Sequence, residues 1–183
     1  MAVVDRSSVI IGSGQLYLAE FEGSDFPDDT TFEADENSVG RIKGGAVLTY
    51  EPEEYPIVDD NGETVLIFMT AENATFKTGF LNWDMQNLAK LTPNKVIEPT
   101  GTDTDRKLII GGAAALSKYA LRFVHTKTNG MKLRITMVGT AGSGFELNFA
   151  GDTETVLDAE FRAINQDDGT LVEIRDQIRP VTP

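Results

Sequence analysis

The chain has 183 residues, of which 40% are hydrophobic and 25% are charged, and its formal net charge is −13. This length is enough for one domain with a sizeable core. Cysteine is absent, which excludes disulfides and thiolate metal sites. No apolar run approaches the about 20 residues of a membrane span, and no early run resembles a signal peptide, so we expect synthesis in the cytoplasm.

The acidity is concentrated in the first part of the chain. Residues 1–100 carry 18 acids and 6 bases, a balance of −12, whereas residues 101–183 carry 11 acids and 10 bases, a balance of −1. Such a chain should repel nucleic acid unless a local basic stripe intervenes.

The chain begins with a polar arm, residues 1–13. Residues 15–21 alternate in polarity and predict a strand. Residues 22–45 then contain seven acids and little periodicity, which indicates a long loop. Two interpretations of this loop stay open: a solvated loop, or an arm that lies on a neighbouring molecule.

Residues 46–81 predict the dominant element, a long β-hairpin. Two extended runs flank the turn sequence Asp59-Asp60-Asn61-Gly62, in which Asn and Gly tolerate positive φ. Each run is far longer than the usual strand of about five to six residues. Pro52 and Pro56 would remove two donors on the same side, so this strand should be an edge. We expect the outer half of the hairpin to lie on another copy of the chain.

Alternation separates the hairpin into an apolar face and a polar face. The apolar row includes Ala74, Phe76 and Phe80. The polar face holds Thr49, Glu51, Asn73, Thr75 and Lys77.

A short helix is predicted over residues 82–91, with Asn82 as its N-cap and Pro93 after its end. We expect the helix to pack over the sheet through an apolar set of side chains. That set is Trp83, Met85, Leu88 and Leu91.

The rest of the chain is predicted to be β. A second hairpin, over residues 119–138, is expected to have a three-residue turn ending at Gly130, because this register pairs Phe123 with Ile135. Its polar face gathers a basic cluster, Arg122, Lys132 and Arg134, for which we expect acids of another subunit as partners. Shorter strands are predicted at residues 96–97, 107–110, 145–149, 156–164 and 170–178, followed by a tail at 179–183.

No motif indicates catalysis, a cofactor or a metal. The glycine-rich stretch 139–144 is not followed by a helix, so it lacks the N-terminus that cradles a phosphate. His125 is the sole histidine and lies on the apolar side of a predicted strand. The acidic stretches 59–63 and 103–105 do not have the spacing of a calcium loop. We therefore expect neither an enzyme nor a cofactor-dependent protein.

Four stretches of the chain resemble the tail tube, or major tail, proteins of tailed bacteriophages. They are GQLYLAEF, GRIKGGAVLTYEPEEYPIVDDNGETV, ATFKTGFLNWDMQNLAKL and VLDAEFRAI with the following NQDDGTLVEI. The resemblance implies a single domain over residues 1–183 with a β-sandwich or barrel-like fold and one flanking helix. It also implies rings of six copies that stack into a tube through which double-stranded DNA passes without specific binding.

Site residues and partners follow from the same resemblance. The polar face of the hairpin would line the lumen, which the acidity of the chain predicts to be anionic. The arm that reaches the next ring would use Glu53, Glu54, Tyr55, Asp59, Asp60 and Asn61. Partners would be further copies and other tail proteins, such as the tape measure, terminator, baseplate or sheath, and the protein would reside in the virion.

Two other classes of function are also compatible with the sequence. A monomeric acidic β-sandwich binding module would explain the strands and the charge, and it should tolerate deletion of residues 52–64. A small β-rich enzyme would need a convergent polar pocket, which the pattern does not indicate.

Overall fold

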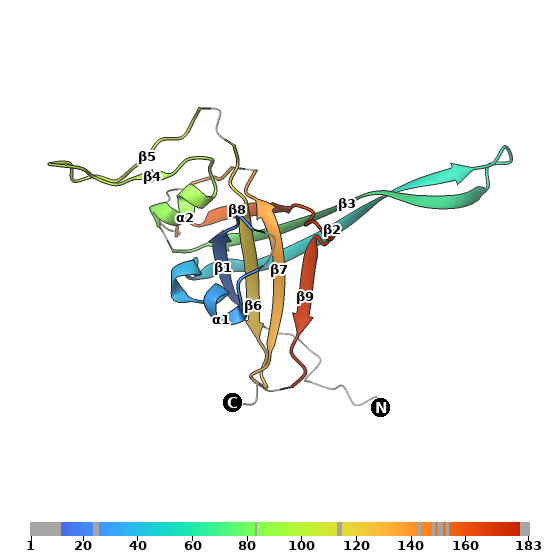
Figure 1. The fold of residues 1–183 in the computed structure, drawn as a ribbon, viewed down its shortest axis with the longest axis horizontal. Coiled ribbons are helices and arrows are strands. Elements are labelled where there is room, and N and C mark those ends of the chain that lie inside the picture. Colours follow the sequence, from blue (N-terminus) through green and yellow to red (C-terminus); the bar gives the residue numbers. More distant parts are fainter. Residues whose placement is uncertain are drawn as a thin grey trace.

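The computed structural model describes residues 12–23, 26–82, 84–112, 115–142, 144–147, 149, 152 and 154–179. Trp83, most of the N-terminal arm and the last four residues lie outside the described residues. In chain order the elements are β1 (Gln15–Glu20), α1 (Asp29–Phe32), the 3-10 helix η2 (Asp35–Asn37), β2 (Ile42–Val58), β3 (Thr64–Phe80), α2 (Met85–Lys90), β4 (Val96–Ile97), β5 (Lys107–Leu108), β6 (Tyr119–Thr126), β7 (Lys132–Thr140), β8 (Leu157–Ala163) and β9 (Val172–Asp176) (Figure 1).

The expected mainly β fold is confirmed. An antiparallel seven-stranded sheet has the order β1-β6-β7-β8-β3-β2, with β9 also paired to β7, and β4 and β5 form a separate two-stranded sheet. Within the described part of the chain, no helix has the length and hydropathy needed to cross a membrane.

The large sheet bends at β7. One edge of β7 pairs with β6, whereas the other edge is shared between β9 (Leu133 to Met137) and β8 (Gly139 and Thr140). Gly139 permits the close approach of β8, because a Cβ there would lie 2.5 Å from the carbonyl oxygen of Arg162. The part formed by β2, β3 and β8 therefore runs across the part formed by β1, β6, β7 and β9 (Figure 1).

The main core lies between these two parts of the sheet. The rings of Phe76 on β3 and Phe123 on β6 are 5.9 Å apart. The predicted apolar face of the hairpin base is confirmed, since Phe76 and Phe80 are fully buried. The core also takes side chains from the other strands and from α2: Leu16, Leu18, Leu88, Leu91, Leu121, Met137, Leu157 and Phe161.

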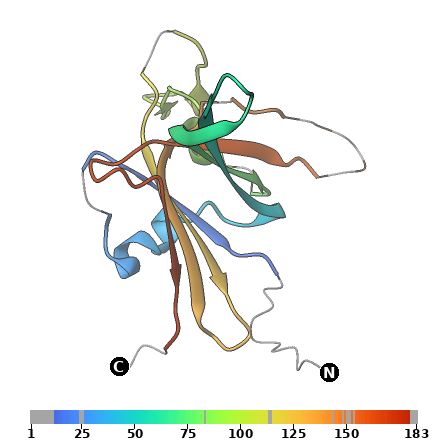
Figure 2. The ribbon, with the colours of Figure 1, turned by 90° about the vertical axis from the view of Figure 1, so that its right-hand side faces the viewer.

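The long hairpin is confirmed, and each of its strands has 17 residues. Gly62 has φ of +84°, and the Asp59 carboxylate accepts the backbone N–H groups of Asn61 and Glu63 at 2.9 and 2.8 Å. Strand β3 pairs with β8 only at its base, from Thr75 to Phe80. Beyond that point the hairpin projects from the body (Figure 1), and in Figure 2 it points toward the viewer.

Helix α2 begins later than predicted. It starts at Met85, and Asp84 is its N-cap, with the side chain accepting from the backbone N–H of Gln86 at 3.1 Å. Asn82 instead accepts the backbone N–H of Arg41 at 3.0 Å, which fixes the segment entering β2. Asn82 was predicted wrongly as the N-cap because Asn82 and Asp84, on either side of Trp83, are both residue types that commonly cap helices.

The acidic stretch 22–45 is more ordered than predicted. It contains α1, η2 and the first residues of β2. Phe32 at the end of α1 is fully buried and forms a second, small core with Tyr17, Ala120 and Val124 on the opposite face of the sheet. Here one turn of helix is too short to show periodicity in the sequence.

The second hairpin has the predicted register. Phe123 is opposite Ile135, and Gly130 has φ of +80°. No strand is assigned to the described residues of the predicted strand 145–149, and β5 ends at Leu108 rather than at residue 110.

Candidate functional site

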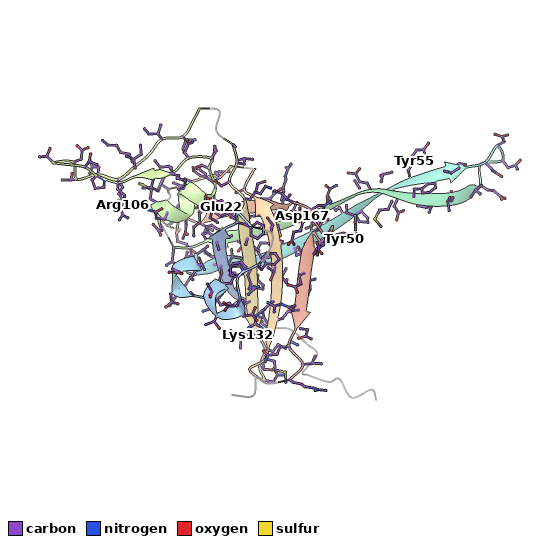
Figure 3. All side chains as sticks on the ribbon, in the orientation of Figure 1. Glu22, Tyr50, Tyr55, Arg106, Lys132 and Asp167 are labelled. Atoms are coloured by element: carbon purple, nitrogen blue, oxygen red, sulfur yellow. The ribbon has the colours of Figure 1, made fainter. Side chains whose placement is uncertain are left out.

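The outer half of the β2–β3 hairpin exposes apolar side chains on both of its faces. Tyr55 is paired with Phe68, and Ile57 is paired with Leu66, so these four share one face. Tyr55 is 62% exposed and Phe68 51% exposed. The other face carries the exposed side chains of Val65, Ile67 and Met69. Figure 3 shows Tyr55 on the projecting ribbon, far from the body.

A strand that is apolar on both faces is normally covered on both sides. The run from Val65 to Met69 has no polar residue, and no described residue of the chain covers it. An isolated two-stranded ribbon is only marginally stable in water, and exposed apolar strands pair readily with other chains. The outer hairpin is therefore a candidate self-association surface.

The same ribbon is strongly acidic. Between residues 51 and 72 there are seven acids and no base. All six of the predicted arm residues lie there: Glu53, Glu54 and Tyr55 on β2, and Asp59, Asp60 and Asn61 at or next to the turn. Glu53 accepts a hydrogen bond from the Asn73 amide at 3.0 Å, across to β3. The exposed outer hairpin is thus strongly acidic.

The five residues of the predicted polar face come together in one groove. Thr49, Glu51, Asn73, Thr75 and Lys77 line a groove of about 510 Å³ over β2, β3 and β8. Strand β8 adds Glu160 and Arg162, because Lys77 is paired with Glu160 and Thr75 with Arg162. The alternation of residues 156–164 puts Glu160 and Arg162 on the polar face of the predicted strand. It does not show that this strand lies next to β3.

The charges in this groove are balanced. Its acids, Glu51 and Glu160, are matched by its bases, Lys77 and Arg162. The Lys77 ammonium lies 2.9 Å from the Glu160 carboxylate, and the Arg162 guanidinium lies 3.7 Å from the same group. The predicted polar face of the hairpin base is therefore, in the single chain, a polar face of balanced charge.

The basic cluster has its partners in the same chain, which corrects the expected intersubunit role. Glu33, just after α1, accepts from Arg134 Nε at 2.5 Å and from Lys132 Nζ at 2.6 Å. Asp29 in α1 accepts from Arg122 at 2.8 Å and from Arg175 of β9 at 2.6 Å. The short helix therefore neutralises the cluster by folding back over β6 and β7.

Arg122 is the centre of this network and is only 2% exposed. Its Nε donates to the Thr136 hydroxyl at 3.1 Å, and its guanidinium carbon lies 4.4 Å from the centroid of the Phe32 ring. Burial lowers the pKa of the Arg122 guanidinium, while Asp29 opposes this shift. A group so enclosed holds α1 against the sheet and is not accessible to a partner.

Acid should weaken this network. Burial acts to raise the pKa of Glu33, but hydrogen bonds from Arg134 and Lys132 outweigh it and lower the pKa below 4.5. A carboxylate with a lowered folded-state pKa contributes stability above its unfolded value, and that stability is lost as pH falls through the folded pKa. We expect the melting temperature to fall below pH 4.5 less steeply for Glu33→Gln than for the unaltered protein, measured by calorimetry across pH. Identical slopes would contradict this assignment.

The helix residues pack largely as predicted. Leu88 and Leu91 are buried in the main core, and Met85 is half-buried. Asn87 on α2 is also buried and donates to the Val39 carbonyl at 3.1 Å. His125 is buried, with Nδ1 lying 2.7 Å from the Ser13 carbonyl oxygen, so it anchors the start of the described chain.

Among the described residues, no group of three or more His, Asp or Glu side chains is arranged to hold a metal ion. No protein-family model matches the chain, and no curated protein matches it either.

Proposed function

We propose that this protein is a structural subunit that assembles with copies of itself into hexameric rings, which stack into the tail tube of a phage or tail-like particle. The observation that carries the proposal is the outer hairpin, whose two apolar faces are both exposed in the single chain. Burying one Leu or Phe side chain contributes about 1.5–3 kcal/mol, so covering this ribbon is a strong driving force. The resemblance of the four sequence stretches to tail tube proteins gives the form of the assembly.

The bent sheet suits this role. In the proposed assembly it is the β-sandwich or barrel-like fold of the tail tube family, and joining sheets from neighbouring copies removes their exposed edges. The groove residues Thr49, Glu51, Asn73, Thr75 and Lys77 face the lumen. A balanced polar wall has no cationic stripe to hold phosphates, so DNA slides past it without lasting contacts.

Electron microscopy of the purified, negatively stained protein tests the proposal directly. We expect rings or tubes at high protein concentration and neutral pH. Dispersed monomers, with the hairpin rigid and protected from hydrogen exchange on its own, would falsify the proposal. In that case the monomeric binding module becomes the better interpretation, and deletion of residues 52–64 should leave its fold and solubility unchanged.

The lumen assignment has a separate test. Replacing Glu51 by lysine makes the polar wall cationic, because three bases then face one acid in the groove. Because each added phosphate contact strengthens electrostatic binding of DNA, we expect particles with this variant to assemble but eject DNA more slowly, and more so at low salt. Unchanged DNA ejection, measured by dye release, would count against the lumen assignment.

A further inference from the structure

The molecule has a second projecting element, which we call the β4–β5 arm (residues 95–112). It leaves the body at the end opposite to the β2–β3 hairpin (Figure 1). Figure 3 shows the same opposition, with Arg106 on this arm and Tyr55 on the hairpin. Among the described residues, the strands β4 and β5 pair only with each other, through two residue pairs. The arm therefore has little structure of its own beyond this short ladder.

The β4–β5 arm also exposes aliphatic side chains that no described part of the chain covers. Ile109 is 63% exposed and Ile110 59% exposed, and Ile97 on β4 is about half exposed at 48%. Beside them lie three bases and three acids, a net charge of zero in a chain of −13. The bases include Arg106 and Lys107, which are paired with Glu98 at 2.9 Å and Asp103 at 3.7 Å.

From this geometry we infer that the hairpin of one copy docks on the β4–β5 arm of the next copy. The inference rests on the proposed function and names the receiving surface for the hairpin. A contact between two hairpins would bring together two ribbons that each carry seven acids and no base between residues 51 and 72. Like charges disfavour such a contact, so the hairpin needs a different surface as its partner.

The described chain has another pair of exposed aliphatic side chains next to a strand, Ile174 and Ile178 at β9. The ion pairs beside the two sites differ. The cation between Ile174 and Ile178, Arg175, is hydrogen-bonded to Asp29 inside the basic cluster. On the β4–β5 arm, by contrast, both members of each ion pair are more than half exposed. Exposed pairs are weak, so Arg106 and Lys107 can exchange their partners for the acids of a docked hairpin.

The contact is therefore heterologous: it joins two different surfaces of identical chains. Such a contact closes into a ring or continues into a filament, depending on the rotation between neighbours. The arrangement of the two projecting elements at opposite ends is what this kind of contact requires.

Cysteine cross-linking tests the inference, since the natural chain has no cysteine. Phe68→Cys is mixed with Ile109→Cys, the two are co-assembled, and a short bis-maleimide is added. Every cross-link then joins two chains, because each chain has one thiol. We expect a covalent heterodimer as the main product, identified by mass spectrometry of the linked peptides. The matched control, Phe68→Cys with Ile174→Cys, should give only background.

A charge variant provides an independent measurement. Replacing Ile109 and Ile110 together by glutamate should cause loss of the assembled species in sedimentation, with an unchanged circular dichroism spectrum. The same replacement at Ile174 and Ile178 should leave assembly intact. Two results would overturn the inference but leave the proposed function standing. One is normal assembly of the variant with glutamate at 109 and 110. The other is cross-linking of Phe68→Cys to Ile174→Cys but not to Ile109→Cys. Absence of assembly by the unaltered protein overturns the proposed function instead.

Discussion

Replacing Leu66 and Phe68 together by glutamate is expected to abolish self-assembly while the fold of the monomer is retained. Both side chains are about half exposed in the single chain, and they share a face of the outer hairpin with Tyr55 and Ile57. Their loss removes two large apolar groups from the contact, worth about 1.5–3 kcal/mol each when buried. A loss of about 4 kcal/mol weakens association by roughly a thousandfold.

Sedimentation velocity and negative-stain microscopy measure this effect. The matched control replaces the same two residues by isoleucine and tyrosine, which keep the surface apolar, and it should assemble like the unaltered protein. The circular dichroism spectrum of the glutamate variant should match that of the unaltered protein, because the main core does not include these side chains. If the glutamate variant still forms rings or tubes, the outer hairpin is not the association surface.

The largest effect on stability is expected at Glu33. Its side chain is 8% exposed and it is the acid closest to both Lys132 and Arg134. Glu33→Ala leaves a partly buried group of cations with Asp29 alone, and breaking such pairs costs about 3–5 kcal/mol. Because the site retains some access to water, we expect a loss near the lower limit, which lowers the melting temperature by roughly 6–12 °C for a chain of this length.

The same substitution at an exposed ion pair is the control. Glu98 and Arg106 are both about half exposed, and Glu98→Ala should cost less than about 1 kcal/mol. Chemical denaturation of the three proteins gives the comparison. Equal losses for the two variants would show that the α1 network contributes no more than a surface pair.

Local patterns in the sequence predicted the hairpins accurately. The Asp59–Gly62 turn and the register of Phe123 against Ile135 both follow from turn chemistry and alternation, which act over a few residues. The apolar run from Val65 to Met69 was visible as well, and its lack of alternation is the signal that both faces need cover.

The order of strands in the sheet could not be obtained in this way. Strand β1 pairs with β6 about a hundred residues later, with Leu16 opposite Phe123. Strand β7 has three partners, and this depends on the close approach of β8 at Gly139. Which strands become neighbours depends on how whole faces of the sheet pack, because one alternating pattern is compatible with several neighbouring strands.

The error about the basic cluster has the same origin. The sequence showed Arg122, Lys132 and Arg134 on one face but not what covers them. The covering element, α1, is a four-residue helix, and Asp28 caps it by accepting the backbone N–H groups of Thr30 and Thr31. Only the fold brings Asp29 and Glu33 across to cations about a hundred residues away.

The opposite placement of the hairpin and the β4–β5 arm gives any string of copies a direction (Figure 1). One end of the polymer then exposes an acidic hairpin that has no partner, and the other end exposes a β4–β5 arm of zero net charge that has no partner. Growth can start on a template that offers one chemistry, and a capping protein can stop it by matching the other. In the proposed polymer, initiation and termination thus depend on two different surfaces of a single polypeptide.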